Sequence, residues 1–175
     1  MQATRTTPSV GSTQGSAAWR RPVLLVATGA VALSIGVFVY VTDRSATQAW
    51  RLPGFGAFAG LHVLGALGQW LPSFVHPLAF SLFTAAALPP SSAPRYGVCA
   101  AWAAVNVGFE IGQHPWVSAR LAAALEGVPL ARPLARYFTQ GTFDRADIAA
   151  ALLGALAAGL VLRRLQRDLE HKHAQ

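Results

Sequence analysis

Charged residues are scarce in this chain of 175 residues. Asp, Glu, Lys and Arg together make up 12% of it, whereas an ordinary soluble domain contains about 25%. Hydrophobic residues make up 53%, and the mean hydropathy is +0.39. This balance excludes a water-soluble globule. The few charges are also unevenly spread, because none falls in the stretches 22–42, 52–94, 96–109, 111–119 and 148–162.

Cysteine and acidic residues are also rare. The one cysteine, Cys99, excludes an intrachain disulfide and a zinc cluster built on cysteines. Seven acidic residues face 14 basic ones, which gives a formal net charge of +7. The basic residues flank apolar runs and do not cluster with aromatic residues, so we expect no nucleic-acid partner. Their expected role is to set the membrane topology.

The uncharged stretches predict an all-α integral membrane helical bundle. A spanning helix needs about 20 apolar residues, and we expect about four transmembrane helices, over 22–41, 72–90, 96–114 and 145–163. Prolines decide the second span, because a helix that started only at Pro77 would be too short to cross. We therefore expect it to begin near Pro72 and to close before Pro89.

Two further segments are not predicted to span the membrane. The glycine-rich stretch 52–71 is expected to be interfacial or re-entrant, with a fifth span as the alternative. The stretch 116–140 carries charges and prolines and is expected to be an amphipathic interfacial segment. The membrane domain would then cover 22–165, between a disordered cytoplasmic tail over 1–21 and a basic cytoplasmic tail over 166–175.

The basic residues favour cytoplasmic termini. With four spans and the N-terminus inside, eight basic residues are cytoplasmic and six are outside, spread over longer loops. We therefore expect a multi-pass protein of the bacterial cytoplasmic (inner) membrane with both termini inside. The cytoplasmic set is Arg5, Arg20, Arg21, Arg95, Arg163, Arg164, Arg167 and Lys172, and the outer set is Arg44, Arg51, Arg120, Arg132, Arg136 and Arg145.

Polar residues should converge at the outer leaflet. The third span carries polar side chains at spacings of three and four residues, which places them on one helical face. The start of the second span and the start of the fourth lie at the same membrane surface. The expected cluster is His76, Asn106, Glu110, Gln113, His114, Asp144 and Asp147. Glu110 is the strongest single candidate, because a membrane-embedded acid usually has a partner or a task.

Structural roles compete with functional ones at these positions. Glu110 could simply hold helices together through a hydrogen bond, and His76 could belong to the start of a helix. Asp144 and Asp147 fit an N-cap and its partner three residues later. His76, Glu110 and His114 form no recognised metal motif, so neither a metal nor another cofactor is expected.

Two surfaces outside this cluster are also expected to bind. Arg132 and Arg136 alternate with Leu130 and Leu134 at helical spacing, which suits contact with a lipid phosphate and with the apolar interface at once. Small residues recur every fourth position in the fourth span, at Ala151, Gly154, Ala155, Ala158 and Gly159. Such a face lets a helix pack closely on another helix.

Three motifs resemble those of the VanZ-like membrane proteins. They are Leu71-Pro-Ser-Phe-Val-His76-Pro-Leu-Ala-Phe, Gly108-Phe-Glu110-Ile-Gly-Gln113 and Gly141-Thr-Phe-Asp144-Arg-Ala-Asp147, the last followed by Gly154. The resemblance covers about residues 70–160, and His76, Glu110, Gln113 and Asp147 match the shared pattern. The usual asparagine four residues after the aspartate is Ala151 here, and a longer segment separates Gln113 from Asp147.

The resemblance implies a small multi-span bacterial protein of the cell envelope, in a family associated with glycopeptide-type antibiotic resistance. We expect a non-enzymatic protein that binds an amphiphile or a partner at the outer leaflet. The alternatives are a membrane enzyme acting on a lipid-linked phosphate-containing substrate, with His76 and Glu110 as acid and base, and a packing subunit of a larger membrane complex. The expected partners are membrane lipids and a lipid-linked envelope precursor or another membrane protein.

Overall fold

The computed structural model describes residues 14–43, 64–89, 94–128 and 131–173. Within these ranges the chain forms six helices and no strand, which confirms the all-α class. The helices are α1 (Gln14–Asp43), α2 (Ala66–Ala87), α3 (Pro94–Gly112), α4 (Pro115–Ala124), α5 (Arg132–Gln140) and α6 (Arg145–His173).

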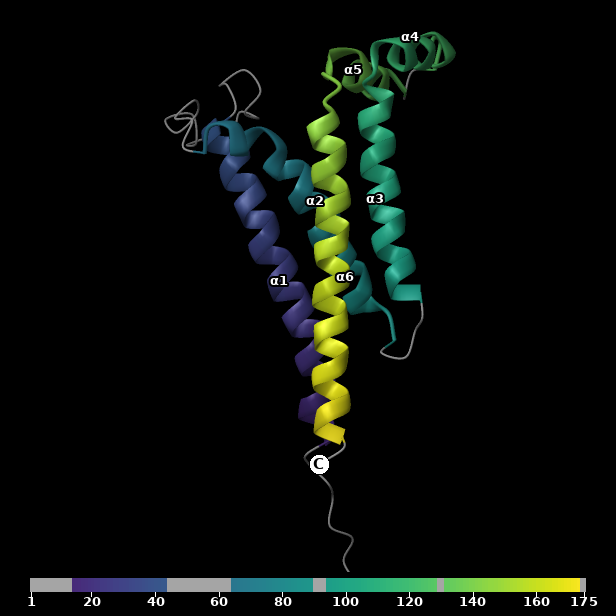
Figure 1. Cartoon of the computed structure of the whole chain (residues 1–175). Helices are drawn as coiled ribbons and strands as arrows, with labels where there is room; N and C mark the ends of the chain where they lie inside the picture. Colours follow the sequence, from purple (N-terminus) through teal and green to yellow (C-terminus); the bar gives the residue numbers. More distant parts are fainter. Residues whose placement is uncertain (1–13, 44–63, 90–93, 129–130, 174–175) are drawn as a thin grey trace, which may run out of the picture.

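Four long helices run side by side, and the two short helices lie together at one end (Figure 1). α2 is central, because it packs against α1, α3 and α6, and α6 also packs against α3. We call the end with α4 and α5 the upper end. The start of α1 and the end of α6 lie at the opposite, lower end (Figure 1).

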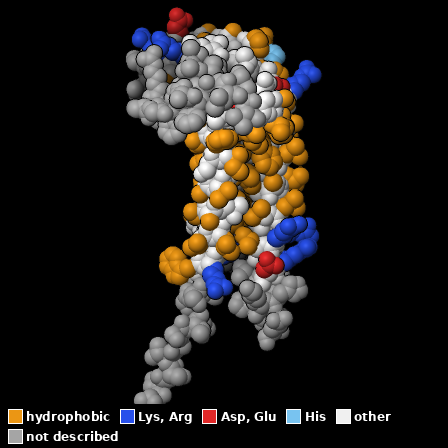
Figure 2. All heavy atoms as spheres, turned by 90° about the vertical axis from the view of Figure 1, so that its left-hand side faces the viewer, with side chains coloured by type: hydrophobic (Ala, Val, Ile, Leu, Met, Phe, Trp, Pro, Cys, Tyr) orange, Lys and Arg blue, Asp and Glu red, His pale blue; other side chains and the backbone are white. Residues whose placement is uncertain are grey.

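Three of the helices are long and apolar enough to cross a membrane. These are Trp19–Asp43 within α1, Ala66–Ala87 in α2 and Arg145–Asp168 within α6. α3 does not reach the same hydropathy, because Arg95, Asn106 and Glu110 lie among its 19 residues. Figure 2 shows one face of the molecule, where hydrophobic side chains cover the long helices and charged ones gather at the two ends.

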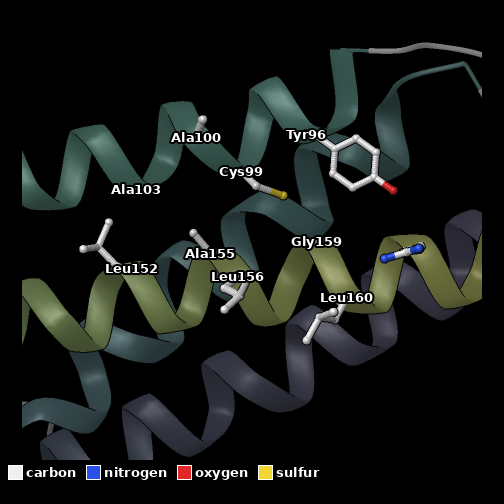
Figure 3. Close-up of a pocket in the computed structure, with 10 residues that line it drawn as sticks. Tyr96, Cys99, Ala100, Ala103, Leu152, Ala155, Leu156, Gly159 and Leu160 are labelled. Atoms are coloured by element: carbon white, nitrogen blue, oxygen red, sulfur yellow. The ribbon is translucent and has the colours of Figure 1, made fainter.

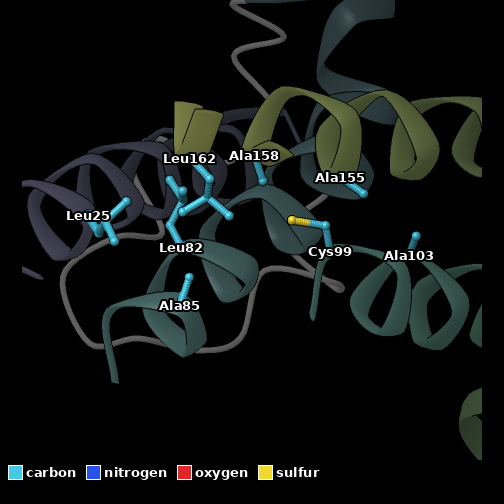
Figure 4. Packing of buried hydrophobic residues seen from close by; sticks show 8 residues of the cluster. All are labelled: Leu25, Leu82, Ala85, Cys99, Ala103, Ala155, Ala158 and Leu162. Atoms are coloured by element: carbon cyan, nitrogen blue, oxygen red, sulfur yellow. The ribbon is translucent and has the colours of Figure 1, made fainter. Parts of the chain in front are cut away.

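The core between the long helices is built mostly from small and aliphatic side chains. One cluster joins α1, α2, α3 and α6 (Figure 4): Leu25, Leu82, Ala85, Cys99, Ala103, Ala155, Ala158 and Leu162. A second cluster of Ala32, Val75 and Ala79 lies between α1 and α2.

The small-residue face of α6 packs on α2. Ala151, Gly154, Ala155 and Ala158 are buried. A Cβ atom added at Gly154 would overlap the backbone carbonyl oxygen of Phe74 in α2. The helices therefore cross with their backbones nearly in contact, as the spacing of small residues predicts.

α2 begins earlier than predicted, at Ala66, and keeps both Pro72 and Pro77 inside the helix. Residues 66–71 are therefore helical, and residues 52–63 of the predicted interfacial segment lie outside the described residues. The reason for the early start is Asp43 at the end of α1, whose two carboxylate oxygens accept the N–H of Leu64 at 3.3 and 3.1 Å. This contact fixes the chain just before α2 and places a carboxylate near its positive end.

Other boundaries also differ from the sequence-based ones. α1 begins before the predicted tail ends, although residues 1–13 lie outside the described part. α6 continues to His173, so most of the predicted basic tail is helical. The segment 116–140 contains α4 and α5, and Leu130 lies outside the described residues.

The crossing of α2 and α6 gives a matched pair of substitutions. Gly154→Ala should lower the free energy of unfolding by about 1–3 kcal/mol, because the added methyl group meets backbone that cannot rotate away. Gly159→Ala is the control, since its Cβ would lie 3.9 Å from the nearest atom, Cδ1 of Tyr96. It should be neutral or stabilising by up to about 1 kcal/mol, since alanine favours helix. Denaturant titrations in micelles would compare them, and equal effects would contradict the close crossing.

The basic-residue count gives a topology prediction. In a Cys99→Ala background, a cysteine at the exposed position Glu126, next to α4, should react with a membrane-impermeant maleimide on intact cells. A cysteine at the exposed position Asp168, near the lower end of α6, should react only after the membrane is opened. The opposite labelling pattern would invert the topology and place the upper end in the cytoplasm.

Candidate functional site

A polar cavity of about 530 Å³ lies at the upper end of the bundle. Its walls come from the last turn of α1, the first half of α2, the end of α3, α5 and the start of α6. The lining residues are Tyr40, Pro72, Ser73, His76, Asn106, Phe109, Glu110, Gln113, Tyr137, Gln140, Gly141, Thr142, Asp147 and Ala151.

The cavity brings together five of the residues that the sequence places in one cluster: His76, Asn106, Glu110, Gln113 and Asp147. They come from three different parts of the chain. Their convergence follows from the antiparallel order of α2, α3 and α6, which sets the start of α2 and of α6 beside the end of α3.

Glu110 joins the end of α3 to the start of α6. Its side chain is only 8% exposed, and its Oε1 atom accepts the backbone N–H of Asp144 at 2.5 Å. Asp144 immediately precedes α6, so this N–H belongs to the helix start, where backbone donors lack partners within the helix. The Glu110 carboxylate therefore accepts a hydrogen bond from a backbone N–H that has no acceptor within α6.

Asp144 and Asp147 have different roles at the start of α6. Asp144 is the N-cap, because its Oδ1 atom accepts the N–H of Ala146 at 2.8 Å. In a capping box, the side chain at the position of Asp147 would accept a hydrogen bond from the backbone N–H of the N-cap residue. Here Glu110 accepts that N–H from another helix. The side chain of Asp147 lines the cavity instead.

His76 belongs to an aromatic row between α2 and α3. Its ring stacks on Phe80, with centroids 6.0 Å apart and planes 20° apart. Phe80 in turn stacks on Trp102 of α3 at 4.9 Å, and the indole Nε1 of Trp102 donates to Oγ1 of Thr84 at 3.0 Å. The row supports one side of the imidazole, and His76 contributes to the cavity wall.

α5 forms part of the cavity wall and contacts α3 through aromatic rings. Phe138 stacks on Phe109 at 5.7 Å, and Tyr137 meets Phe109 edge-on at 5.6 Å. Nε2 of Gln113 also donates to the Tyr137 hydroxyl at 3.2 Å. A Cβ atom at Gly112 would overlap the Phe138 ring, so this glycine lets α5 approach closely.

Four other predicted site residues do not line the cavity. Asp144 acts as the cap described above, and His114 is exposed, with its ring edge-on to Phe143 at 5.1 Å. Arg132 and Arg136 are exposed on α5. On the neighbouring helix α4, the guanidinium carbon of Arg120 lies 3.6 Å from the centre of the Trp116 ring.

Several lining residues were not in the predicted cluster, notably Tyr40, Tyr137, Gln140 and Thr142. Tyr40 had a usable signal, because it lies near the end of the first span and hence at the same membrane surface as the cluster. Tyr137, Gln140 and Thr142 depend on how α5 folds back over α3, which no periodicity in the sequence specifies.

A second cavity of about 410 Å³ lies between α3 and α6 and is almost wholly apolar. Figure 3 shows residues of the two helices along it. It is lined by Tyr96, Cys99, Ala100, Ala103, Leu152, Ala155, Leu156, Gly159, Leu160 and Arg163. Such a lining suits an acyl chain and offers little for chemistry.

In the described part of the chain, no group of three or more His, Cys, Asp or Glu side chains is placed to hold a metal ion. No protein-family model matches the chain, and neither does a curated protein or a solved structure.

Three substitutions test the contact between Glu110 and Asp144, because each should change the free energy of unfolding by a different amount. Glu110→Gln should change the free energy of unfolding by less than about 0.5 kcal/mol, because the amide oxygen can still accept the Asp144 N–H. Glu110→Ala should cost about 1–3 kcal/mol, since it leaves that N–H without an acceptor. Asp144→Ala should cost about 1 kcal/mol through loss of the N-cap. Unfolding titrations would measure all three, and a Glu110→Gln loss as large as that of Glu110→Ala would contradict this role.

Proposed function

We propose that this chain is a VanZ-like integral membrane protein of the bacterial envelope that binds an amphiphile or a partner and catalyses no reaction. The observation that carries the proposal is the polar cavity at one end of a bundle whose long helices expose many large hydrophobic side chains. The headgroup of an amphiphile would enter the cavity while its chains stay in the bilayer. The resemblance of three motifs to the VanZ-like proteins supports the assignment, because His76, Glu110, Gln113 and Asp147 all line this cavity.

α3 is the proposed fourth span. Its 19 residues give a length of about 28 Å, close to the hydrocarbon thickness of about 30 Å. It packs against α2 and α6, so its polar residues need not face lipid. With four spans, the upper end lies at the outer leaflet and both termini are cytoplasmic, in accordance with the distribution of basic residues.

The cavity lining indicates the chemistry of the headgroup. Among the described residues it contains two carboxylates, Glu110 and Asp147, together with amides and hydroxyls, and no arginine or lysine. Such a lining accepts hydroxyl, amide or amine donors and would repel a phosphate. Arg132 and Arg136 on α5 are better placed to contact phosphates of the surrounding headgroups.

Two alternatives receive less support. An acid–base enzyme would couple His76 to Glu110, yet Glu110 binds the Asp144 N–H, and no hydrogen bond joins it to His76 among the described residues. A packing subunit would use the small-residue face of α6 as an interface. That face already packs on α2 within this chain.

The proposal predicts that cavity residues control retention of a co-purified amphiphile. Wild type and variants would be extracted in native-lipid particles, and bound amphiphiles would be identified and counted by mass spectrometry. Asp147→Asn should lower the retention of a cavity ligand about tenfold or more, because a hydrogen bond to a charged group contributes about 1.5–3 kcal/mol. Glu110→Gln should also weaken retention while leaving the fold stable.

His114→Gln is the matched control, because His114 lies next to the cluster in sequence but outside the cavity lining. It should retain the ligand as wild type does. Equal retention by all variants would refute the cavity as the binding site. A bound molecule that is chemically converted by wild type and not by Glu110→Gln would favour the enzyme instead.

A further inference from the structure

Two arginines are buried at the lower end of the bundle, far from the cavity. Arg21 in α1 is 7% exposed, and Arg95 in the first turn of α3 is 2% exposed. Arginine is rarely buried so deeply unless it is paired. Arg20, the neighbour of Arg21, is exposed, as are Arg163 and Arg164 at the same end. Membrane topology requires only that such charges remain on one side, so it does not explain why two of them are buried.

The buried guanidinium groups have few partners. Nη2 of Arg95 donates to the carbonyl oxygen of Pro89 at 2.7 Å. Within the described residues, the remaining buried donors have no hydrogen-bond acceptor: Nε and Nη1 of Arg95, and Nε and Nη2 of Arg21. No carboxylate pairs with either arginine among the described residues. A buried polar group without a partner is costly, and a buried charge without one more so.

The two groups are also close enough to repel each other. Leu25 and Cys99, which lie one helical turn after Arg21 and Arg95, belong to the same core cluster, and the two guanidinium groups carry the same charge. Two buried cations with N–H groups that lack an acceptor in the described structure offer the groups that bind an anion. A bound anion would attract both guanidinium groups, which otherwise repel each other. It would also accept hydrogen bonds from their N–H groups.

The donor geometry indicates which anion fits. A guanidinium group presents a planar fork of N–H groups that matches the oxygens of a phosphate, often through two parallel bonds. The first turn of α3 adds backbone N–H groups that have no partner within the helix and the positive end of a helix dipole. Figure 2 places charged side chains at this end, just beyond the apolar band, at the level expected for lipid headgroups.

We propose that Arg21 and Arg95 bind a phosphate group between α1 and the start of α3. The phosphate would link two helices that otherwise meet mainly through α2. An anionic phospholipid and a soluble phosphate share this chemistry, and the two sources can be separated by experiment.

The test measures stabilisation of the purified full chain in a neutral detergent. The lipid probe is phosphatidylglycerol, compared with a diacylglycerol of the same acyl chains that lacks the phosphate. The soluble probe is inorganic phosphate, compared with sodium chloride at equal ionic strength. At a probe concentration about 100 times its dissociation constant, the melting temperature of wild type should rise by about 5–10 °C.

Arg21→Gln and Arg95→Gln should each lose most of this rise. Arg20→Gln is the matched control, because it removes the same charge from an exposed neighbour on the same helix. It should keep the full rise. Native mass spectrometry should show the same order, with about tenfold fewer phosphatidylglycerol molecules retained by Arg21→Gln than by Arg20→Gln.

The outcomes are distinct. Stabilisation by phosphatidylglycerol alone identifies a lipid headgroup, and equal stabilisation by inorganic phosphate identifies a site that needs no acyl chain. Failure of both probes to stabilise wild type would overturn the proposal. An equal loss of the melting-temperature rise in Arg20→Gln would also overturn the proposal, because it would show a general attraction of anions to the basic surface.

A further measurement separates ligand binding from a structural role. Without phosphate, Arg21→Gln should melt at or above the wild-type temperature. It removes one of two buried charges of the same sign, and Nε and Nη2 of Arg21 have no acceptor among the described residues. A marked loss of stability without phosphate, or failure to fold, would show that Arg21 supports the helices directly. That result would also overturn the proposal.

Discussion

The hydrogen bond between the Glu110 carboxylate and the backbone N–H of Asp144 determines how the upper end of the molecule is built. It fixes the start of α6 against the end of α3, two points separated by α4, α5 and their connections. Because Glu110 takes the donor that a residue of α6 would otherwise bind, Asp147 can line the cavity. One buried acid therefore fixes a helix start, and a second acid lies in the cavity lining beside it.

The remaining architecture follows from close backbone contact around α2. Gly154 lets α6 lie directly on the α2 backbone, and Asp43 holds the end of α1 against the chain that leads into α2. With α2 held from both sides, His76 and Ser73 stay at a fixed height in the cavity wall. The aromatic row through Phe80 and Trp102 ties the same part of α2 to α3.

Much of this arrangement could be predicted from the sequence. Gaps in charge predicted the long helices, and helical spacing within 96–114 predicted that Asn106, Glu110 and Gln113 share a face. The start of α2 could not be predicted from its prolines, because a long-range contact with Asp43 stabilises residues ahead of Pro72. Periodicity also could not separate Asp144 from Asp147, since their difference depends on Glu110 in another helix.

α6 packs against both α2 and α3 and supplies Asp147 to the cavity. It is also the last of the six helices in chain order, and a chain is synthesised from its N-terminus. When α1 to α3 have been synthesised and α6 has not, the α2 backbone that meets Gly154 is uncovered, and Glu110 lacks the Asp144 N–H. At that point the chain contains an acid without its helix-start donor and an uncovered face of α2. Packing of α6 covers that face, supplies the Asp144 N–H to Glu110 and adds Asp147 to the cavity lining.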